Sequence, residues 1–232
     1  MSDYREMQTT ITERIRRVRD SLDAIRGKDA VTICAVTKTV PPETVNLIRD
    51  TGVRIIGENR VQEAVSKLPA LNPCFSLHII GQLQTNKVKY IIDKARMIQS
   101  LDRMPLAVEI DKRAQALGIV MDALIEVSIA HEPQKGGIPE TELEAFLHSV
   151  AKLPGIRVRG LMSVMPNVPD PEEIRPYFRE MRLWFERMRE LGISGVAMDT
   201  LSMGMSHDWQ TAAQEGATMV RIGSAFFGSR MQ

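Results

Sequence analysis

The sequence has little of what disulfide-linked, metal-binding or membrane proteins need. Its 232 residues include two cysteines, Cys34 and Cys74, and neither these nor the four histidines have the spacing of metal ligands or of a disulfide framework. No apolar run approaches the ~20 residues of a transmembrane helix, and the amino terminus lacks the apolar core of a signal peptide. We therefore expect a cytoplasmic protein with no metal and no membrane partner.

Net charge and nucleotide-binding motifs are also scarce. Thirty basic and 29 acidic residues leave a formal charge of +1, so electrostatics gives no reason to expect a nucleic-acid partner. No G-x-G-x-x-G or Walker A pattern follows an apolar segment, which weakens the prediction of an open, doubly wound sheet that binds a nucleotide. Hydrophobic residues at 44% are ordinary for a globular protein.

What the sequence does contain is a regular alternation of strand and helix patterns. An apolar stripe at helical spacing predicts an N-terminal helix over about residues 3–26, and its arginines are expected on a solvated face. The stripe consists of Met7, Ile11, Ile15, Val18, Leu22 and Ile25, and the arginines are Arg14, Arg16, Arg17 and Arg19. Strands are predicted at 31–37, 53–56, 76–80, 97–100, 121–129, 156–161, 196–201 and 218–222. Helices are predicted near 42–51, 60–68, 85–95 and 103–117, after Pro139, from about Pro176 to Gly192, and at 207–215.

Repeated strand–helix units imply a parallel sheet with right-handed crossovers. Eight of them predict an α/β fold: a single (β/α)8 TIM-type barrel with an extra N-terminal helix. That helix would cover the gap left after the last strand, where no helix is predicted. We expect one domain over residues 1–232, with the barrel at about 30–228, and the open doubly wound sheet is the alternative.

Lys38 follows the first predicted strand directly. Five of the six residues from Val31 to Val36 are apolar, which suits a strand buried on both faces, and Pro41-Pro42 ends it. An ammonium at this strand end must find a partner, reach solvent or lose its charge, because burial lowers the pKa of a lysine. Lys38 is thus either an ordinary lysine that reaches water or the neutral amine that Schiff-base chemistry needs.

The segments after the last two predicted strands carry small and hydroxyl-bearing residues. Barrels frequently bind phosphate there, and Gly204 and Gly223 would let the backbone approach a ligand while Ser206 and Ser224 donate hydroxyls. In the simpler interpretation, Ser206 caps the next helix and Asp208 lies in its first turn. Both interpretations stay open at this point.

Two further polar residues lie on strands that should be buried. Arg221 needs a partner there, which is either the carboxylate of Asp199 or Glu126 or a ligand nitrogen. His78 is expected to be a core residue with satisfied hydrogen bonds rather than a catalytic base.

Seven motifs in order resemble the pyridoxal phosphate homeostasis protein family, single-domain relatives of the alanine racemase barrel. The resemblance extends from about residue 30 to 228. The motifs are Ala35-Val36-Thr37-Lys38-Thr39, Gly57-Glu58-Asn59-Arg60-Val61-Gln62-Glu63, His78-Ile79-Ile80-Gly81-Gln82-Leu83-Gln84-Thr85-Asn86-Lys87, Lys135-Gly136-Gly137, Arg159-Gly160-Leu161-Met162, Leu201-Ser202-Met203-Gly204-Met205-Ser206 and Val220-Arg221-Ile222-Gly223.

This resemblance implies a site for pyridoxal 5′-phosphate (PLP). Lys38 would form the internal aldimine and Arg221 would face the pyridine nitrogen. The phosphate would be held by Ser206, Gly223 and Ser224, with Asn59, Ser202 and Met203 completing the pocket. The chain departs from many relatives at Val40, where a second lysine is common, and at His207, where Asp or Ala is frequent.

The resemblance also implies a cofactor carrier that supports PLP and amino-acid homeostasis. Racemases of this barrel type take a second base from a β-rich domain, and we expect none here because the chain ends within ten residues of its eighth strand. PLP-dependent apoenzymes are the expected recipients of the cofactor, and we expect a monomer. The alternatives are a low-rate amino-acid racemase and a Schiff-base lyase that works without cofactor.

Overall fold

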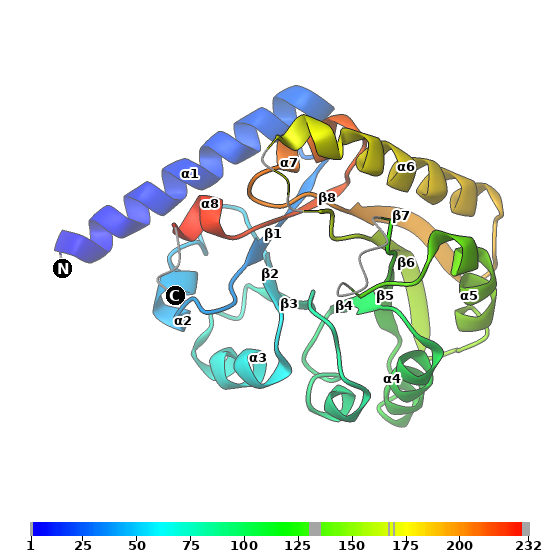
Figure 1. Cartoon of the computed structure of the whole chain (residues 1–232). Helices are drawn as coiled ribbons and strands as arrows, with labels where there is room; N and C mark the ends of the chain where they lie inside the picture. The colour runs from blue at the N-terminus through cyan, green and yellow to red at the C-terminus, as the bar shows by residue number, and fades with distance from the viewer. Residues whose placement is uncertain (1, 130–135, 167, 169, 229–232) are drawn as a thin grey trace.

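The computed structural model describes residues 2–129, 136–166, 168 and 170–228. Its eight strands form a closed, fully parallel barrel in sequential order (Figure 1). β1 pairs with both β2 and β8, so that Cys34 is aligned with Ile55 on one side and with Arg221 on the other. This pairing of the first strand with the last confirms the (β/α)8 barrel and excludes the open sheet.

The elements have the following bounds. The strands are β1 Thr32–Val36, β2 Ile55–Glu58, β3 Ser76–Ile79, β4 Met97–Leu101, β5 Met121–Glu126, β6 Ile156–Met162, β7 Val196–Ser202 and β8 Met219–Ile222. The α-helices are α1 Ser2–Arg26, α2 Pro42–Asn46, α3 Val61–Lys67, α4 Met104–Ala116, α5 Leu143–Val150, α6 Pro171–Glu190, α7 Trp209–Gln214 and α8 Ser224–Phe227. Three 3₁₀-helices complete the described part: η1 Leu68–Ala70, η2 Thr85–Tyr90 and η3 Glu140–Glu142.

Four helix predictions were wrong in extent or type. α6 begins at Pro171 rather than near Pro176, because the Asp170 side chain caps it by accepting a hydrogen bond from the backbone N–H of Glu172. The helix expected at 85–95 is the 3₁₀-helix η2, and the one expected at 42–51 ends at Asn46. The short helix α8 follows β8, where no helix was expected.

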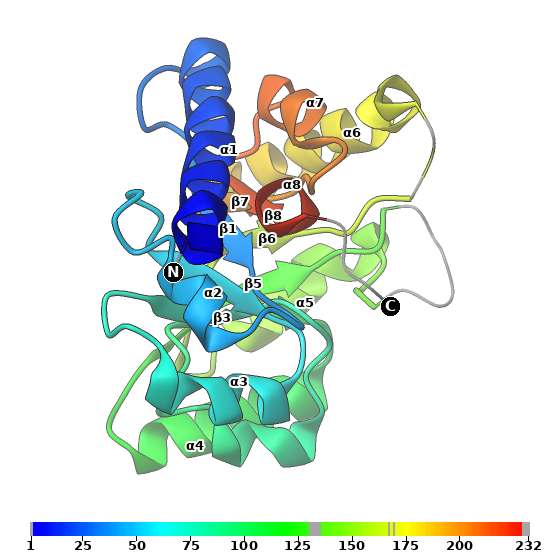
Figure 2. The ribbon, with the colours of Figure 1, turned by 90° about the vertical axis from the view of Figure 1, so that its left-hand side faces the viewer.

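α1 lies against the outside of the barrel, alongside α7 and α8 (Figures 1 and 2). Most of its predicted apolar stripe is buried, Leu22 completely, whereas Met7 is 43% exposed because the first turns extend beyond the barrel. The four arginines of this helix were expected on a solvated face, but two of them make hydrogen bonds to the rest of the protein. Arg14 donates to the carbonyl of Phe226 and Arg19 to that of Val31, so they join α1 to α8 and to the start of β1.

The buried side chains fall into two layers, since successive residues of a strand point to opposite faces. The outward-facing residues, such as Ile98, Ile125 and Leu161, join the large core that the helices cover. The interior of the barrel holds a small apolar cluster of Met97, Leu124 and Met162. The interior also carries a polar layer toward the carboxyl ends of the strands, and that layer supports the candidate site.

Candidate PLP site

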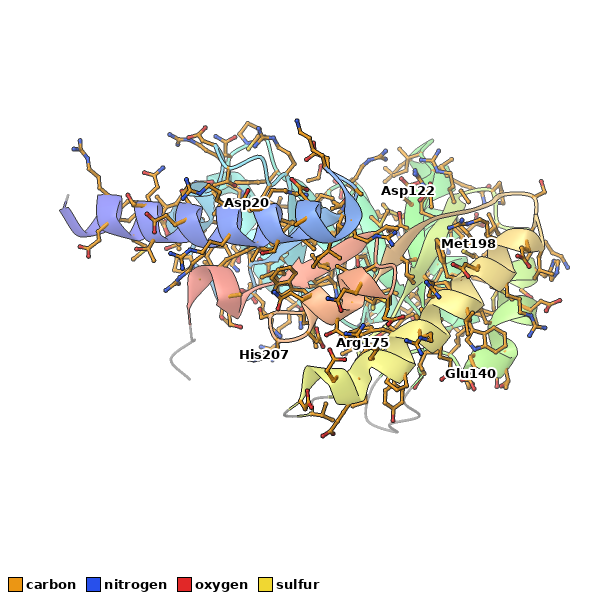
Figure 3. The ribbon with its side chains drawn as sticks, turned by 90° about the horizontal axis from the view of Figure 1, so that it is seen from above. Asp20, Asp122, Glu140, Arg175, Met198 and His207 are labelled. Atoms are coloured by element: carbon orange, nitrogen blue, oxygen red, sulfur yellow. The ribbon has the colours of Figure 1, made fainter. Side chains whose placement is uncertain are left out.

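One pocket at the carboxyl end of the barrel brings Lys38 together with the segments after β7 and β8. It has a volume of about 270 Å³ and is lined by Val36, Lys38, Met205, Ser206, His207, Arg221, Gly223 and Ser224. Figure 3 shows His207 on one side of the molecule and Asp122, near the amino end of β5, on the opposite side. The pocket therefore opens at the end of a barrel where substrate and cofactor sites are found.

Five of the eight site residues predicted from the sequence line this pocket: Lys38, Ser206, Arg221, Gly223 and Ser224. Ser202 lies beneath it, fully buried, and Met203 packs in the hydrophobic core. Asn59 lines a separate pocket of about 280 Å³ after β2 and β3, beside Arg60 and Lys87. Sequence reasoning did not assign Val36, Met205 or His207 to the site. Lys135, also named in a motif, lies outside the described residues.

Arg221 is 4% exposed and its hydrogen bonds go to neutral oxygens. One terminal nitrogen donates to the carbonyl and the hydroxyl of Ser202, each at 2.8 Å, and the other donates to the carbonyl of Ser163 at 2.8 Å. The carboxylate of Asp199 instead accepts from Arg159. Burial lowers the pKa of Arg221 from its ordinary value, and the acidic side chains of Cys34, Glu126 and Asp208 oppose that effect. The guanidinium is thus fixed in place without a partner carboxylate in hydrogen-bonding contact among the described residues.

A chain of buried hydrogen bonds crosses the barrel interior to Arg221. The Ser202 hydroxyl donates to Gln99 Oε1 at 2.7 Å, and Gln99 Nε2 lies 2.9 Å from His78 Nδ1. Burial lowers the pKa of His78 to about 4, so the imidazole is neutral and Nδ1 accepts from the amide. His78 is a core residue with a satisfied hydrogen bond, as predicted. Gln99 gave no sequence signal, because only the closed barrel brings β3, β4, β7 and β8 together.

The segment from Gly223 into α8 forms the other wall of the pocket. The Ser206 hydroxyl accepts hydrogen bonds from the backbone N–H groups of Gly223 and Ala225, at 3.2 and 3.3 Å. It therefore does not cap α7, whose N-cap residue is Asp208. The Asp208 carboxylate is buried and accepts from the backbone N–H of Met205. That hydrogen bond turns the carboxylate toward its own loop.

A pair of carboxylates lies at the ends of β4 and β5. Glu126 and Asp102 both approach Gly136, within 3.3 and 3.5 Å of the position that a β-carbon on that glycine would occupy. Burial, followed by the charge of Asp102, raises the pKa of Glu126 to about 7. Within the described ranges, no three His, Cys, Asp or Glu side chains form a group able to hold a metal ion. Nor does any helix of those ranges have the length and hydrophobicity to cross a membrane.

Known proteins match this chain over nearly its full length. The family model described as alanine racemase, N-terminal domain, matches residues 9–231. A curated relative from Aquifex aeolicus, named pyridoxal phosphate homeostasis protein, is 44% identical over 227 residues and is matched over 97% of each chain. A second curated relative of the same name, from Escherichia coli, is 34% identical over 95% of this chain.

Solved structures agree with these matches. The structure of PipY from Synechococcus elongatus with PLP bound has a TM-score of 0.85 at 32% identity, and the alignment covers 94% of this chain and 100% of PipY. Alanine racemase from Corynebacterium glutamicum, at 17% identity and a TM-score of 0.75, shares the fold over 96% of this chain and 62% of its own. The chain therefore belongs to the alanine racemase N-terminal domain family and, within it, to the pyridoxal phosphate homeostasis proteins.

Proposed function

We propose that this protein binds PLP through Lys38 and acts as a carrier that buffers and delivers the cofactor, in support of PLP and amino-acid homeostasis. The observation that carries the proposal is the pocket where Lys38, Arg221 and the Ser206–Ser224 wall meet. The relative from Aquifex aeolicus is named for pyridoxal phosphate homeostasis, and PipY has been solved with PLP bound. Both support a role in binding and supply rather than in turnover.

The residues of the pocket fit the chemical groups of PLP. When bound, PLP supplies an aldehyde that condenses with a primary amine and releases water. Lys38 provides that amine at the pocket wall. Ser206 and Ser224 offer hydroxyl groups suited to a phosphate, and Gly223 lies beside them at the pocket wall. We propose that these four residues hold the cofactor, with Ser202 and Met203 supporting the pocket from below.

Arg221 is the residue we propose to face the pyridine nitrogen. A guanidinium has donors only and keeps its proton, so a ring nitrogen beside it acts as an acceptor and stays unprotonated. An unprotonated ring withdraws electrons weakly, which suits storage better than carbanion chemistry. The backbone and hydroxyl acceptors on Ser202 and Ser163 hold the guanidinium rigidly for this role. We propose that Asn59, which lines a separate pocket after β2, also contributes to cofactor binding.

A low-rate amino-acid racemase is the second candidate, and His207 is the observation that favours it. Racemisation needs acid–base groups on both faces of a cofactor. Among the residues that line the described pocket, His207 is the one side chain besides Lys38 of a type that commonly acts as a catalytic base. His207 is exposed and belongs to the loop that carries Ser206, so it lies at the proposed phosphate end. We therefore favour the carrier.

The visible absorption spectrum and an amino-acid assay together test this proposal. With PLP added, the protein should develop the absorption band of a lysine-bound cofactor. Lys38→Ala should abolish or shift the band, and the exposed control Lys89→Ala should keep it. Incubation with L-amino acids should give no D-isomer above background. A band unchanged in Lys38→Ala would refute the role of Lys38, and D-isomer formation that His207→Ala removes would establish the racemase instead.

We propose a cytoplasmic monomer made of a single PLP-binding barrel domain over residues 1–232, which hands PLP to PLP-dependent apoenzymes. Its two cysteines are not joined in a disulfide, in keeping with a reducing compartment.

A further inference from the structure

The turn that carries Lys38 has an unfavourable backbone conformation. Thr39 has φ +63°, in the left-handed region that a β-branched residue rarely adopts. The turn also continues β1: the Thr37 N–H bonds to the carbonyl of Gly57, and the Val40 N–H bonds to the carbonyl of Thr37. A strained conformation persists only where surrounding contacts enforce it. The left-handed conformation of Thr39 therefore depends on contacts around the turn.

Charged side chains from β2 and α3 supply these contacts on both sides of Lys38. On the side of Thr37, Lys67 Nζ donates to the carbonyl at 2.7 Å, and the Thr37 hydroxyl donates to Glu58 at 2.6 Å. On the side of Thr39, the backbone N–H donates to Glu63 at 2.5 Å. Lys67 joins the two carboxylates, at 3.0 Å from Glu58 and 2.5 Å from Glu63. We call Glu58, Glu63 and Lys67 the turn clamp.

The burial of the turn clamp argues against a role in stability alone. Glu58 is 1% exposed and Lys67 8%, and one Glu58 oxygen has no hydrogen-bond partner among the described residues. Burial raises the pKa of Glu58 more than its hydrogen bonds from Thr37 and Lys67 lower it. Buried ion pairs with an unsatisfied atom are usually no better for stability than apolar residues of the same size. The feature that apolar residues could not reproduce here is the set of bonds to the backbone around Lys38.

We propose that Glu58, Glu63 and Lys67 are positioning residues that hold the turn so that the Lys38 amine reaches the pocket in the geometry needed to capture the PLP aldehyde. This inference rests on the proposed function. The hydrogen bonds of the clamp within the described residues reach the backbone on both sides of Lys38, and none of them reaches the phosphate wall at Ser206 and Ser224. If the cluster only attached α3 to the barrel, its loss would affect Lys38 and the phosphate wall alike.

The binding of two ligands distinguishes a positioning role of the clamp from a purely structural role. Pyridoxine 5′-phosphate has the ring and the phosphate of PLP but no aldehyde, so its binding does not need the Lys38 amine. Glu63→Gln, which removes charge with little change of shape, should weaken PLP capture about tenfold or more. Its affinity for pyridoxine 5′-phosphate should stay within twofold of that of the parent. Lys67→Met should do the same, and Lys67→Arg should recover part of the loss.

Glu109→Gln is the matched control, because Glu109 and Arg113 form an ion pair of the same i,i+4 spacing on α4. It should change neither ligand's affinity. Equal weakening of both ligands by Glu63→Gln would overturn the proposal in favour of a structural role, as would no weakening of either. If Lys67→Met does not fold, Glu63→Gln alone carries the test.

Hydrogen exchange on the protein without PLP tests the clamp independently of the proposed function. In Glu63→Gln, the amides of residues 37–40 should exchange severalfold faster, while those of β5 should keep the exchange rate of the parent. If the amide exchange rates of residues 37–40 did not change, the proposed role of the clamp would be refuted, whether or not the protein binds PLP. Faster exchange in a protein that captures no PLP would instead refute the proposed function and leave the clamp standing.

Discussion

Arg221 shows how one buried residue can be a candidate ligand contact and a well-satisfied structural group at once. The three hydrogen bonds of its guanidinium to described residues go to the carbonyl and hydroxyl of Ser202, at the end of β7, and to the carbonyl of Ser163, which follows β6. From sequence alone, an arginine on a buried strand called for a partner, either a carboxylate or a ligand nitrogen. The barrel supplies neutral acceptors instead, and it does so at the wall of a pocket. A positive charge is therefore placed where a ligand can use it.

Glu126 should make the stability of the protein depend on pH. Its pKa is raised to about 7 by burial, so between about pH 4.5 and 7 the folded protein holds a proton that the unfolded chain releases. Stability contributed by that proton is present below pH 4.5 and is lost as the pH rises to 7. Glu126→Gln, which cannot ionise, should therefore gain about 2 kcal/mol in the free energy of unfolding at pH 8 relative to pH 5.

Urea unfolding at pH 5 and pH 8 checks this prediction. The exposed control Glu190→Gln should follow the pH profile of the parent. A Glu126→Gln variant whose gain is the same at both pH values would contradict a protonated Glu126.

Secondary-structure elements were predictable from the sequence where apolar periodicity and end signals agreed. The eight strands and the stripe of α1 follow from that pattern, and their order led to the barrel. The errors lie where a local signal competed with another: Pro176 suggested a helix start, but Asp170 and Pro171 provide the stronger one. The α-helix expected near 85–95 is the shorter 3₁₀-helix η2, which ends at Tyr90, and the buried residues Val88, Ile91 and Ile92 lie in it or directly after it.

The candidate site was predictable only in part, for a similar reason. Lys38, Ser206, Arg221, Gly223 and Ser224 follow strand ends or lie on a strand that ends at the pocket, and a barrel brings strand ends together. Gln99 and Lys67 carry no such signal, because Gln99 meets Ser202, and Lys67 meets the Thr37 carbonyl, only in the folded barrel. The assignment of PLP to this pocket came from the family resemblance, since spacing alone left the phosphate and lysine interpretations open.

At the scale of the whole molecule, α1 packs along α7 and α8 on the outside of the closed barrel (Figure 2). Leu22 is fully buried in the core that α1 shares with the barrel. Leu22→Ala should therefore lower the free energy of unfolding by about 2–5 kcal/mol, since it removes buried methyl groups and leaves a cavity. The same change at Leu183, which is 55% exposed on α6, should cost about 0.5 kcal/mol or less.

Thermal or urea unfolding of the two variants measures that difference. Equal effects of Leu22→Ala and Leu183→Ala would show that α1 contributes no packing energy to the barrel. The expected difference would show that the packing of α1 stabilises the barrel.

Chemical trapping locates the lysine that binds the cofactor. The protein is incubated with PLP and reduced with borohydride, which converts a carbon–nitrogen double bond to a stable single bond, and its peptides are then analysed by mass spectrometry. We expect one phosphopyridoxyl group, on the peptide that contains Lys38, with Lys67, Lys87 and Lys89 unmodified at stoichiometric PLP. Labelling spread over several lysines, or none at Lys38, would contradict this expectation.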